Sequence, residues 1–381
     1  MTSGATRALQ STAPAAPESE PLADCPAHRQ PVRYIDLHRS PDRRDYFAHA
    51  TRGIAFDAGL KCWIIDEPQI ALEALNSPAL SMLDFAKICA RMDEAGYAVP
   101  NVAFAYAHLP LCQNGEAHRV KRAAMSRRIA ARKKTIETEL PDIIDRHLIL
   151  FGKPGELEVM SQVLQPLVTE IIFKLVDIDA METATLEALP AAFDRLMGHR
   201  KALQVDHEIA EVRARIRDTL GKSGDEPQEG LWLALVMLGR DPLLATLGES
   251  LRHIFHLHSE TPTNEIAFPA VPPETGVAFV ERRAAQDVHF GGHAIRQGDQ
   301  VRIMLQGFAY SATARDNLRI FGAGAHACLG RPLALEVWNL ITAALARMKI
   351  RVRYISSSPR LSDYVFACPK HLNVEILNDT A

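Results

Sequence analysis

Apolar residues recur at intervals of three and four over residues 117–151 and 156–176, a period that is typical of half-buried helices. Similar patterns predict helices over residues 228–258 and 333–350. Nearer the N-terminus, residues 59–66 alternate and include β-branched side chains, which predicts a short strand. A helix over residues 67–76 is expected to follow, with Asp66 as its N-cap and Pro68 in its first turn.

Further strands are predicted late in the chain, where Gly291, Gly292 and Gly298 separate them as turn residues. These strands cover residues 276–282, 288–295, 300–305 and 372–377. Because helical periodicity dominates, the predicted fold class is mainly α with small β-sheets, in a single domain over residues 31–381. Residues 1–30 are rich in Ala, Pro and Ser, which predicts a disordered tail.

The composition is that of an ordinary globular protein. The 381 residues are 47% hydrophobic and 23% charged, and the net charge is −3. No charge excess therefore points to nucleic acid or an anionic membrane as a partner. The sequence has no uninterrupted apolar run of roughly 18 residues, and its beginning lacks the apolar region of a secretory signal. We expect a cytoplasmic protein with neither kind of partner.

The cysteines do not form a disulfide or zinc pattern. None of the six is spaced as Cys-x-x-Cys, so neither a zinc knuckle nor a redox dithiol is predicted. Five of them are expected to be small, buried, hydrophobic side chains: Cys25, Cys62, Cys89, Cys112 and Cys368. Cys328 differs because it lies in a glycine-rich loop directly before a predicted helix.

That loop reads Phe-Gly-Ala-Gly-Ala-His-Ala-Cys-Leu-Gly over residues 321–330. Glycines let a backbone fold tightly around the thiol and against a flat object. Free backbone N–H groups and the positive end of the following helix stabilise a thiolate. A thiolate in this position acts as a metal ligand or as a nucleophile.

The segment resembles the cysteine-ligand loop of the cytochrome P450 family, Phe-Gly-x-Gly-x-His-x-Cys-x-Gly. Its fixed positions are met here by Phe321, Gly322, Gly324, His326, Cys328 and Gly330. The resemblance implies a P450-like fold and haem b as cofactor, with Cys328 as the proximal thiolate ligand of the iron.

Other positions agree with this resemblance. His118 and Arg122 are four residues apart and would lie on one helix face, like the family's His-x-x-x-Arg motif. Arg282 stands where bacterial members carry an arginine that binds a haem propionate, and His326 precedes the cysteine by two residues. The resemblance implies that these four residues bind the two buried propionates.

The central helix departs from the family pattern. Gly239 and Asp241 match, but Pro242 replaces the threonine whose hydroxyl helps to deliver protons. Asp241 with water, or a substrate hydroxyl, would have to take its place, and the proline is expected to kink the helix. Peroxide-using members also carry this proline, directly after an arginine, whereas Asp241 here separates Arg240 from Pro242. Alternatively, Pro242 is only a tolerated kink and Asp241 a surface acid.

Two further family features are missing from their usual places. No Glu-x-x-Arg pair stands between the central helix and Arg282, and Glu249 with Arg252 reads as a surface pair on the central helix itself. The segment over residues 307–320 is also short, as if the stretch before the cysteine loop had been deleted.

Residues 119–134 carry eight Lys and Arg side chains with no acid between them. In the family, this helix presents a positive surface to a ferredoxin or flavodoxin, because opposite charge steers the encounter. A solvated helix face is the simpler alternative. The walls of a substrate pocket are expected from residues 81–111 and 166–204, through Phe85, Tyr97, Phe104, Tyr106, Phe193 and Leu196.

These features favour a haem-thiolate oxidoreductase, in first place a monooxygenase that acts on a small organic molecule with electrons from a ferredoxin-like partner. Peroxide-driven oxidation, dehydration or rearrangement without the threonine proton relay is a second possibility. A non-catalytic member that binds a ligand or recruits another protein is a third.

Overall fold

The computed structural model describes residues 53–178, 186–194, 197–310, 317–359 and 366–377, and they form a mainly helical protein with small sheets, as the sequence predicts. The predicted tail over residues 1–30, Cys25 and Leu196 lie outside these ranges. The α-helices are α3 (Pro68–Asn76), α4 (Phe85–Glu94), α5 (Pro100–His108), α6 (Gly115–Leu148), α7 (Gln165–Leu175), α8 (His199–Leu220), α9 (Glu226–Leu257), α10 (Gln306–Ala309) and α12 (Arg331–Met348). Shorter helical turns cover Pro110–Cys112, Ile149–Gly152, Met160–Leu164, Leu189–Phe193, Gly221–Ser223, Leu318–Phe321 and Gly324–His326.

The strands form three sheets. The largest has the order β1-β2-β8-β5-β3, in which β2 and β8 are parallel. A three-stranded sheet has the order β4-β10-β9, and β6 pairs with β7. The bounds are β1 (Ile54–Asp57), β2 (Cys62–Ile65), β3 (Leu80–Ser81), β4 (Gly155–Glu158), β5 (Phe279–Ala284), β6 (Val288–Phe290), β7 (His293–Ile295), β8 (Gln300–Met304), β9 (Arg351–Pro359) and β10 (Pro369–Leu377).

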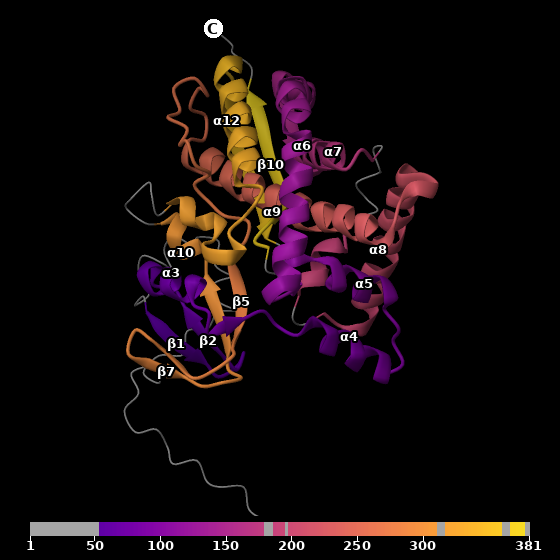
Figure 1. Cartoon of the computed structure of the whole chain (residues 1–381). Coiled ribbons are helices and arrows are strands. Elements are labelled where there is room, and N and C mark those ends of the chain that lie inside the picture. The colour runs from indigo at the N-terminus through magenta and orange to yellow at the C-terminus, as the bar shows by residue number, and fades with distance from the viewer. Residues whose placement is uncertain (1–52, 179–185, 195–196, 311–316, 360–365, 378–381) are drawn as a thin grey trace, which may run out of the picture.

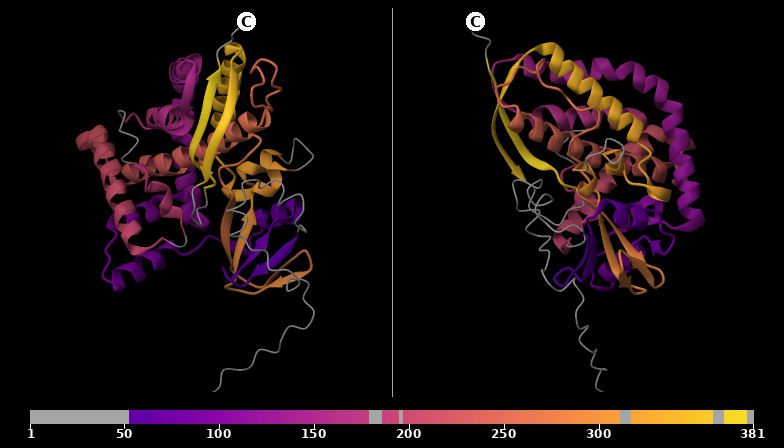
Figure 2. Two further views of the ribbon diagram at one scale, coloured as in Figure 1. Left: turned by 180° about the vertical axis from the view of Figure 1, so that it is seen from behind. Right: turned by 90° about the vertical axis from the view of Figure 1, so that its left-hand side faces the viewer.

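The sheet of β1, β2 and β5 occupies one corner of the molecule together with α3, and the long helices and β10 lie in the rest (Figure 1). The helix α6 runs along the front of the helical part, and α9 passes behind it (Figures 1 and 2). The helix α9 contacts α5, α6, α7 and α8 and also the strands β9 and β10. It is therefore the centre of the main hydrophobic core.

The sequence explains why α9 is buried. Asp225 caps its beginning by accepting a 2.9 Å hydrogen bond from the N–H of Gln228, and Pro227 follows in the first turn. Apolar residues then occur on all sides of the helix, which is typical of a helix enclosed by protein. The helix is long and apolar enough to cross a bilayer, but 78% of its most apolar 18-residue window is buried inside the protein. This burial is that of a core helix.

Two local predictions are wrong. Glu67, not Asp66, caps α3, because its carboxylate accepts the N–H of Ile70 at 2.7 Å. Asp66 instead accepts the N–H of Gly53 at 2.6 Å. The helix predicted over residues 156–176 begins later, since its first residues form β4 and pair with β10. Glu158 fixes this boundary by accepting the N–H of Ser161 at 2.7 Å and that of Leu372 at 2.8 Å.

The Glu249 and Arg252 pair is also not on the surface. Arg252 Nε donates to the Glu249 carboxylate at 2.9 Å, and the two side chains are 18% and 5% exposed, respectively. The pair faces the segment over residues 258–278, which contains no helix and leads from α9 directly into β5. Burial lowers the pKa of Arg252, but the acidic groups around it together outweigh this effect and the net pKa is raised. Glu249 contributes most through its charge and its hydrogen bond, and Glu274 of that segment lies close enough to raise the pKa further. The pair thus ties the end of α9 to the connection that follows it.

Candidate functional site

The loop around Cys328 is held by its own backbone. Gly322 and Gly324 have positive φ angles of 75° and 67°, which only glycine adopts without strain. The Cys328 N–H donates to the Phe321 carbonyl at 2.8 Å and closes the loop. Gly330 is the N-cap of α12, so the free N–H groups at the beginning of that helix are next to the thiol. The sequence pattern therefore produces the thiol-enclosing loop that it predicts.

The thiol of Cys328 is solvent-accessible because it faces a cavity. Protein atoms around the thiol still shield it from much of the solvent, and this desolvation raises its pKa. The N–H groups of Gly330 and Arg331 and the charge of Arg122 lower the pKa in part. The net shift is upward, which favours the neutral thiol. A bound metal ion is the partner that would stabilise the thiolate here. A Cβ at Gly330 would lie 3.8 Å from the sulfur, which is an ordinary van der Waals contact, so Gly330 is close to Cys328.

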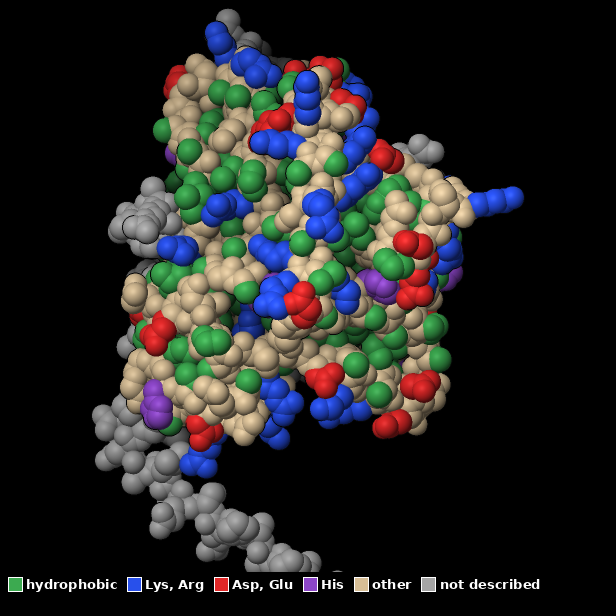
Figure 3. Space-filling view, viewed as in Figure 1, with side chains coloured by type: hydrophobic (Ala, Val, Ile, Leu, Met, Phe, Trp, Pro, Cys, Tyr) green, Lys and Arg blue, Asp and Glu red, His purple; other side chains and the backbone are tan. Residues whose placement is uncertain are grey.

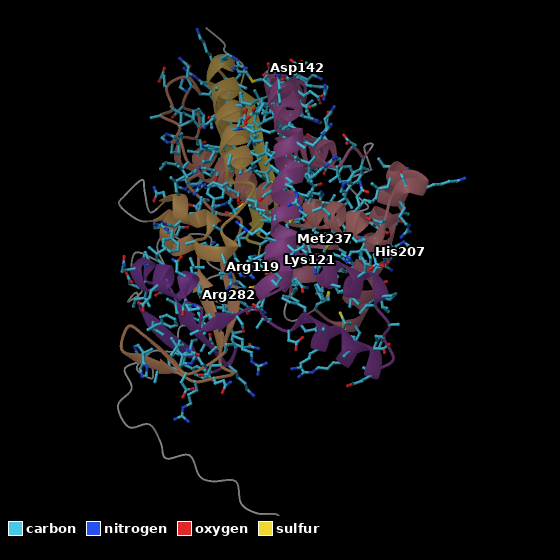
Figure 4. All side chains as sticks on the ribbon, in the orientation of Figure 1. Arg119, Lys121, Asp142, His207, Met237 and Arg282 are labelled. Atoms are coloured by element: carbon cyan, nitrogen blue, oxygen red, sulfur yellow. The ribbon has the colours of Figure 1, made fainter. Side chains whose placement is uncertain are left out.

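Four cationic or basic side chains line the same cavity: His118, Arg122, Arg282 and His326. His118 and Arg122 come from α6, Arg282 from β5 and His326 from the glycine loop. Figure 4 labels Arg282 beside the beginning of α6, where Arg119 and Lys121 lie. The guanidinium of Arg122 donates to the Ala327 carbonyl, and Arg282 donates to the Glu281 carbonyl at 2.8 Å. Three separate segments thus meet at this point.

The cluster is positive and has no carboxylate partner within the described part of the chain. Arg282 is only 4% exposed, and burial lowers its pKa to about 10. Burial and then the charge of Arg282 lower the pKa of His326 to about 3. Burial also lowers the pKa of His118, with Arg122 and Arg282 as further causes. Both imidazoles are therefore neutral at pH 7. Both guanidiniums are positively charged and have no anionic partner within the described residues.

One buried atom in the cluster has no hydrogen-bond partner. His118 is 5% exposed, and its Nε2 atom bonds to nothing in the described structure. Buried polar atoms are nearly always paired, so an unpaired one indicates a group that the site is built to receive. An unpaired ring nitrogen, two guanidiniums and a cysteine thiol around one cavity fit a cofactor that carries both carboxylates and a metal ion.

The cavity has a volume of about 790 Å³, which is in the range of sites that enclose a cofactor or a small organic molecule. Both segments predicted as its walls contribute to it, and Phe85, Tyr106 and Phe193 line it as expected. Tyr97 and Phe104 are not among the lining residues. Instead, Tyr97 stacks on His199 with ring centroids 4.0 Å apart, and Phe104 packs on His108 at 4.2 Å.

The four residues predicted on α9 do not act together. Gly239 and Pro242 line the cavity, whereas Arg240 and Asp241 do not. Arg240 Nη1 lies 2.6 Å from Asp241 Oδ1, and Arg240 Nε donates to Thr169 Oγ1 at 3.0 Å. The two side chains are 4% and 6% exposed. Asp241 is thus neither a surface acid nor a group that faces the cavity.

Sequence reasoning missed Thr246, which lines the cavity one helical turn after Pro242. Its hydroxyl donates to the Pro242 carbonyl at 2.8 Å and accepts the N–H of Gly276 at 3.0 Å. The four-residue spacing from Pro242 was the available signal. Because both hydrogen bonds are to the backbone, this hydroxyl is held in a structural position.

The basic run on α6 is only partly available to a partner. Arg128 and Arg132 both pair with Asp177, at 2.7 Å and 2.6 Å, and also donate to backbone carbonyls at the end of α7. Arg127 and Lys134 are exposed and form no ion pair within the described structure. Lys and Arg side chains follow α6 along the face shown in Figure 3. The expected charged surface is present, but two of its arginines serve the contact of α6 with α7.

The remaining sequence predictions concern cysteines. Cys62, Cys112 and Cys368 are buried, and Cys89 is half-buried. Burial raises the pKa of Cys112 and Cys89. These thiols are therefore packed side chains, in contrast to Cys328.

The fold is that of the cytochromes P450. No family model and no curated protein sequence matches the chain, but 1065 solved chains match it by structure, so the likeness does not depend on a single comparison. The overlap with CalO2 has a TM-score of 0.74 and 15% identity, and covers 90% of this chain and 97% of that chain. The structure of P450BioI with a hexadec-9Z-enoic acid ligated acyl carrier protein gives 0.69 and 16%, over 90% and 99%. That of CYP109E1 from Bacillus megaterium in complex with testosterone gives 0.69 and 14%, over 90% and 99%.

Proposed function

We propose that this chain is a cytoplasmic haem-thiolate oxidoreductase that binds haem b through Cys328 and acts on a small organic molecule. The observation that carries the proposal is the meeting of Cys328 with His118, Arg122, Arg282 and His326 around one cavity. These residues fit haem b, because two guanidiniums and the unpaired buried Nε2 of His118 would bind its propionates. The P450 fold of the chain supports the same assignment.

When haem is bound through a thiolate, electron donation from the sulfur favours cleavage of the O–O bond. The protein would contribute the rest. Arg122 and Arg282 would pair with the propionates, and the N–H groups at the beginning of α12 would hold the thiolate. Apolar side chains of α9 and α4, such as Leu238 and Ile88, would exclude water from the substrate.

The groups on α9 bear on which oxidant is used. Pro242 has neither a hydroxyl nor an N–H, Asp241 is paired with Arg240, and the Thr246 hydroxyl is bonded to the backbone. None of these side chains is in position to donate a proton into the cavity without rearranging. Monooxygenation therefore requires water or a substrate hydroxyl as proton donor. Peroxide-driven oxidation, dehydration or rearrangement does not require a relay on α9, and this geometry favours such chemistry as the second candidate function.

A ferredoxin-like or flavodoxin-like donor would supply electrons for the first of these reactions. The exposed Arg127 and Lys134 on α6 support its docking, because complementary charge speeds association with an acidic protein. The paired Arg128 and Arg132 contribute less, since Asp177 already neutralises part of their charge.

The experiment supplies the haem-loaded protein with a surrogate ferredoxin, its reductase and NADPH, or with hydrogen peroxide alone, across a panel of small organic molecules. Product with the electron donor supports monooxygenation, and product with peroxide alone supports the second candidate. Failure to bind haem would contradict both and would favour a non-catalytic binding protein. Failure of the Cys328→Ser variant to lose activity would also contradict the proposal.

A further inference from the structure

Two arginines that the proposed function does not use lie at the mouth of the cavity. Arg91 on α4 and Arg283 on β5 both line the cavity, and both are also exposed to solvent. A residue with both properties lies where the cavity opens. In Figure 3, Lys and Arg side chains stand on both edges of the hollow between α4 and the sheet that carries β5. The two arginines thus reach the opening from two separate elements, α4 and β5.

Neither arginine pairs with a carboxylate within the described structure. Asp84, which lines the cavity nearby, pairs with Lys87 at 3.1 Å, and Glu281 pairs with Arg302 at 2.8 Å. Arg283 uses only its Nε atom, which donates to the Gly298 carbonyl at 3.1 Å. Arg91 has no hydrogen bond or ion pair from its guanidinium in the same part of the chain. The mouth therefore has two guanidiniums without an ion-pair partner among the described residues.

A third polar group beside them also lacks a partner. Gln300 on β8 lines the cavity and is the register partner of Arg283 on β5. Its Oε1 atom is buried and forms no hydrogen bond within the described structure. A buried amide oxygen without a partner is uncommon, and it can accept a hydrogen bond. Arg283 and Gln300 together form a polar wall at the mouth.

The inner part of the cavity is different. Beyond the cysteine loop and the cationic cluster, its walls are formed by apolar side chains such as Met92, Leu235, Leu243 and Phe366. Methionine and leucine chains adapt to an elongated apolar molecule. Under the proposed function, Arg122 and Arg282 pair with the cofactor. A negatively charged group of the substrate would therefore pair with the arginines at the mouth.

We propose that the substrate is an apolar molecule with a single terminal carboxylate, which enters apolar end first and leaves its carboxylate between Arg91 and Arg283. This inference rests on the proposed function for the direction of entry. Guanidinium groups bind carboxylates through paired, charge-assisted hydrogen bonds. The unpaired Oε1 of Gln300 accepts hydrogen bonds only, so it adds polarity to the mouth and is not a donor to the carboxylate. The substrate class is therefore that of apolar monocarboxylates.

The test is calorimetric titration of the purified haem-loaded protein with three ligands of equal chain length: dodecanoate, its methyl ester and dodecylamine. We expect dodecanoate to bind about tenfold more tightly than the ester, and the amine to bind more weakly still. The double variant Arg91→Gln, Arg283→Gln should reduce the preference for the carboxylate over the ester to about twofold or less. Arg215→Gln on α8 is the control, because that exposed arginine does not line the cavity.

Equal binding of the ester and the carboxylate would overturn the inference, as would a carboxylate preference that survives in the double variant. Absence of dodecanoate binding would do the same. Calorimetry measures binding without turnover. The carboxylate site at the mouth and the proposed haem-thiolate function can therefore be contradicted independently. A carboxylate preference in a protein without a thiolate-type spectrum overturns the proposed function and leaves the mouth assignment standing. A thiolate-type spectrum without that preference overturns only the mouth assignment.

Discussion

The imidazole rings of His118 and His326 face each other with centroids 4.0 Å apart, although one lies on α6 and the other in the glycine loop before α12. Burial and the neighbouring arginines lower the pKa of both rings, so they meet as neutral groups. Arg122 extends the same contact, since it donates to the carbonyl of Ala327. This junction brings the helix of the His-x-x-x-Arg motif to the cysteine loop and places the cationic cluster on the wall of the cavity.

Replacing Arg282 should change haem affinity and protein stability in opposite directions. In the haem-free protein, Arg282 is a buried charge without a carboxylate, so Arg282→Gln should raise the free energy of unfolding by about 1 kcal/mol. Under the proposed function, the same change would remove charge-assisted hydrogen bonds to a haem propionate and should speed haem loss about 10- to 100-fold. Urea unfolding and haem transfer to apomyoglobin measure the two effects.

Arg283→Gln is the matched control for that pair of measurements, because the neighbouring arginine is exposed at the mouth of the cavity. Its haem-transfer rate should equal that of the parent. If Arg282→Gln lost haem at the parental rate, Arg282 would not bind the cofactor.

Pro242→Thr should improve the use of electrons if the protein is a monooxygenase. The change restores a hydroxyl on the cavity side of α9 and an N–H that the helix can use. Product formed per NADPH consumed should rise at least about twofold, because a positioned proton donor becomes available. Thr246→Val should leave this ratio unchanged, since the Thr246 hydroxyl is bonded to the backbone. Tight coupling in the parent would show that water or substrate already supplies the proton.

Reversing the exposed charges on α6 should slow electron transfer from an acidic donor. We expect Arg127→Glu with Lys134→Glu to slow reduction of the protein by ferredoxin in stopped-flow experiments and to leave substrate affinity unchanged. The parent should slow as salt rises to about 0.15 M, where the screening length is about 8 Å, and the variant should respond less. Arg215→Glu with Lys222→Glu, which changes the net charge equally, is the control. A parental rate that ignores salt would mean that α6 is only a solvated face.

Removing the carboxylate of Glu249 should destabilise the fold. Glu249→Gln leaves the mostly buried Arg252 without its main ion-pair partner, and we expect a loss of about 2 kcal/mol in the free energy of unfolding. Asp145→Asn serves as the comparison, because its pair with Arg347 is more than half exposed. That change should cost less than about 0.5 kcal/mol. Equal urea midpoints for the two variants would contradict the structural role of the buried pair.

The sequence predicted the elements whose signals are local. The periodicity of α6, α9 and α12 and the glycine pattern around Cys328 were sufficient, because a helix face or a tight loop is encoded by neighbouring residues. The boundary at β4 was missed since its formation depends on pairing with β10, which lies far along the chain. The cap of α3 was also wrongly predicted because of a contact outside the helix. The carboxylate of Asp66 accepts a hydrogen bond from the N–H of Gly53, and Glu67 caps α3 instead.

The site was predicted only as far as its motifs extended. His118, Arg122 and Cys328 belong to short patterns, but the direction of a side chain on α9 depends on what packs against the helix. Thr169 and the backbone of Leu186 hold Arg240, and Arg240 in turn holds Asp241 away from the cavity. Arg91 and Arg283 carry no motif at all. Only the folded chain brings them to one opening.

The difference spectrum of the reduced protein with carbon monoxide tests the central claim most directly. The parent and the Cys328→Ser variant are each reconstituted with haem b, reduced and exposed to carbon monoxide. A serine hydroxyl has a much higher pKa than a thiol and is a poor ligand, so only the parent should give a thiolate-type band. The same band in both proteins, or no such band in the haem-loaded parent, would contradict the assignment of Cys328 as the haem ligand.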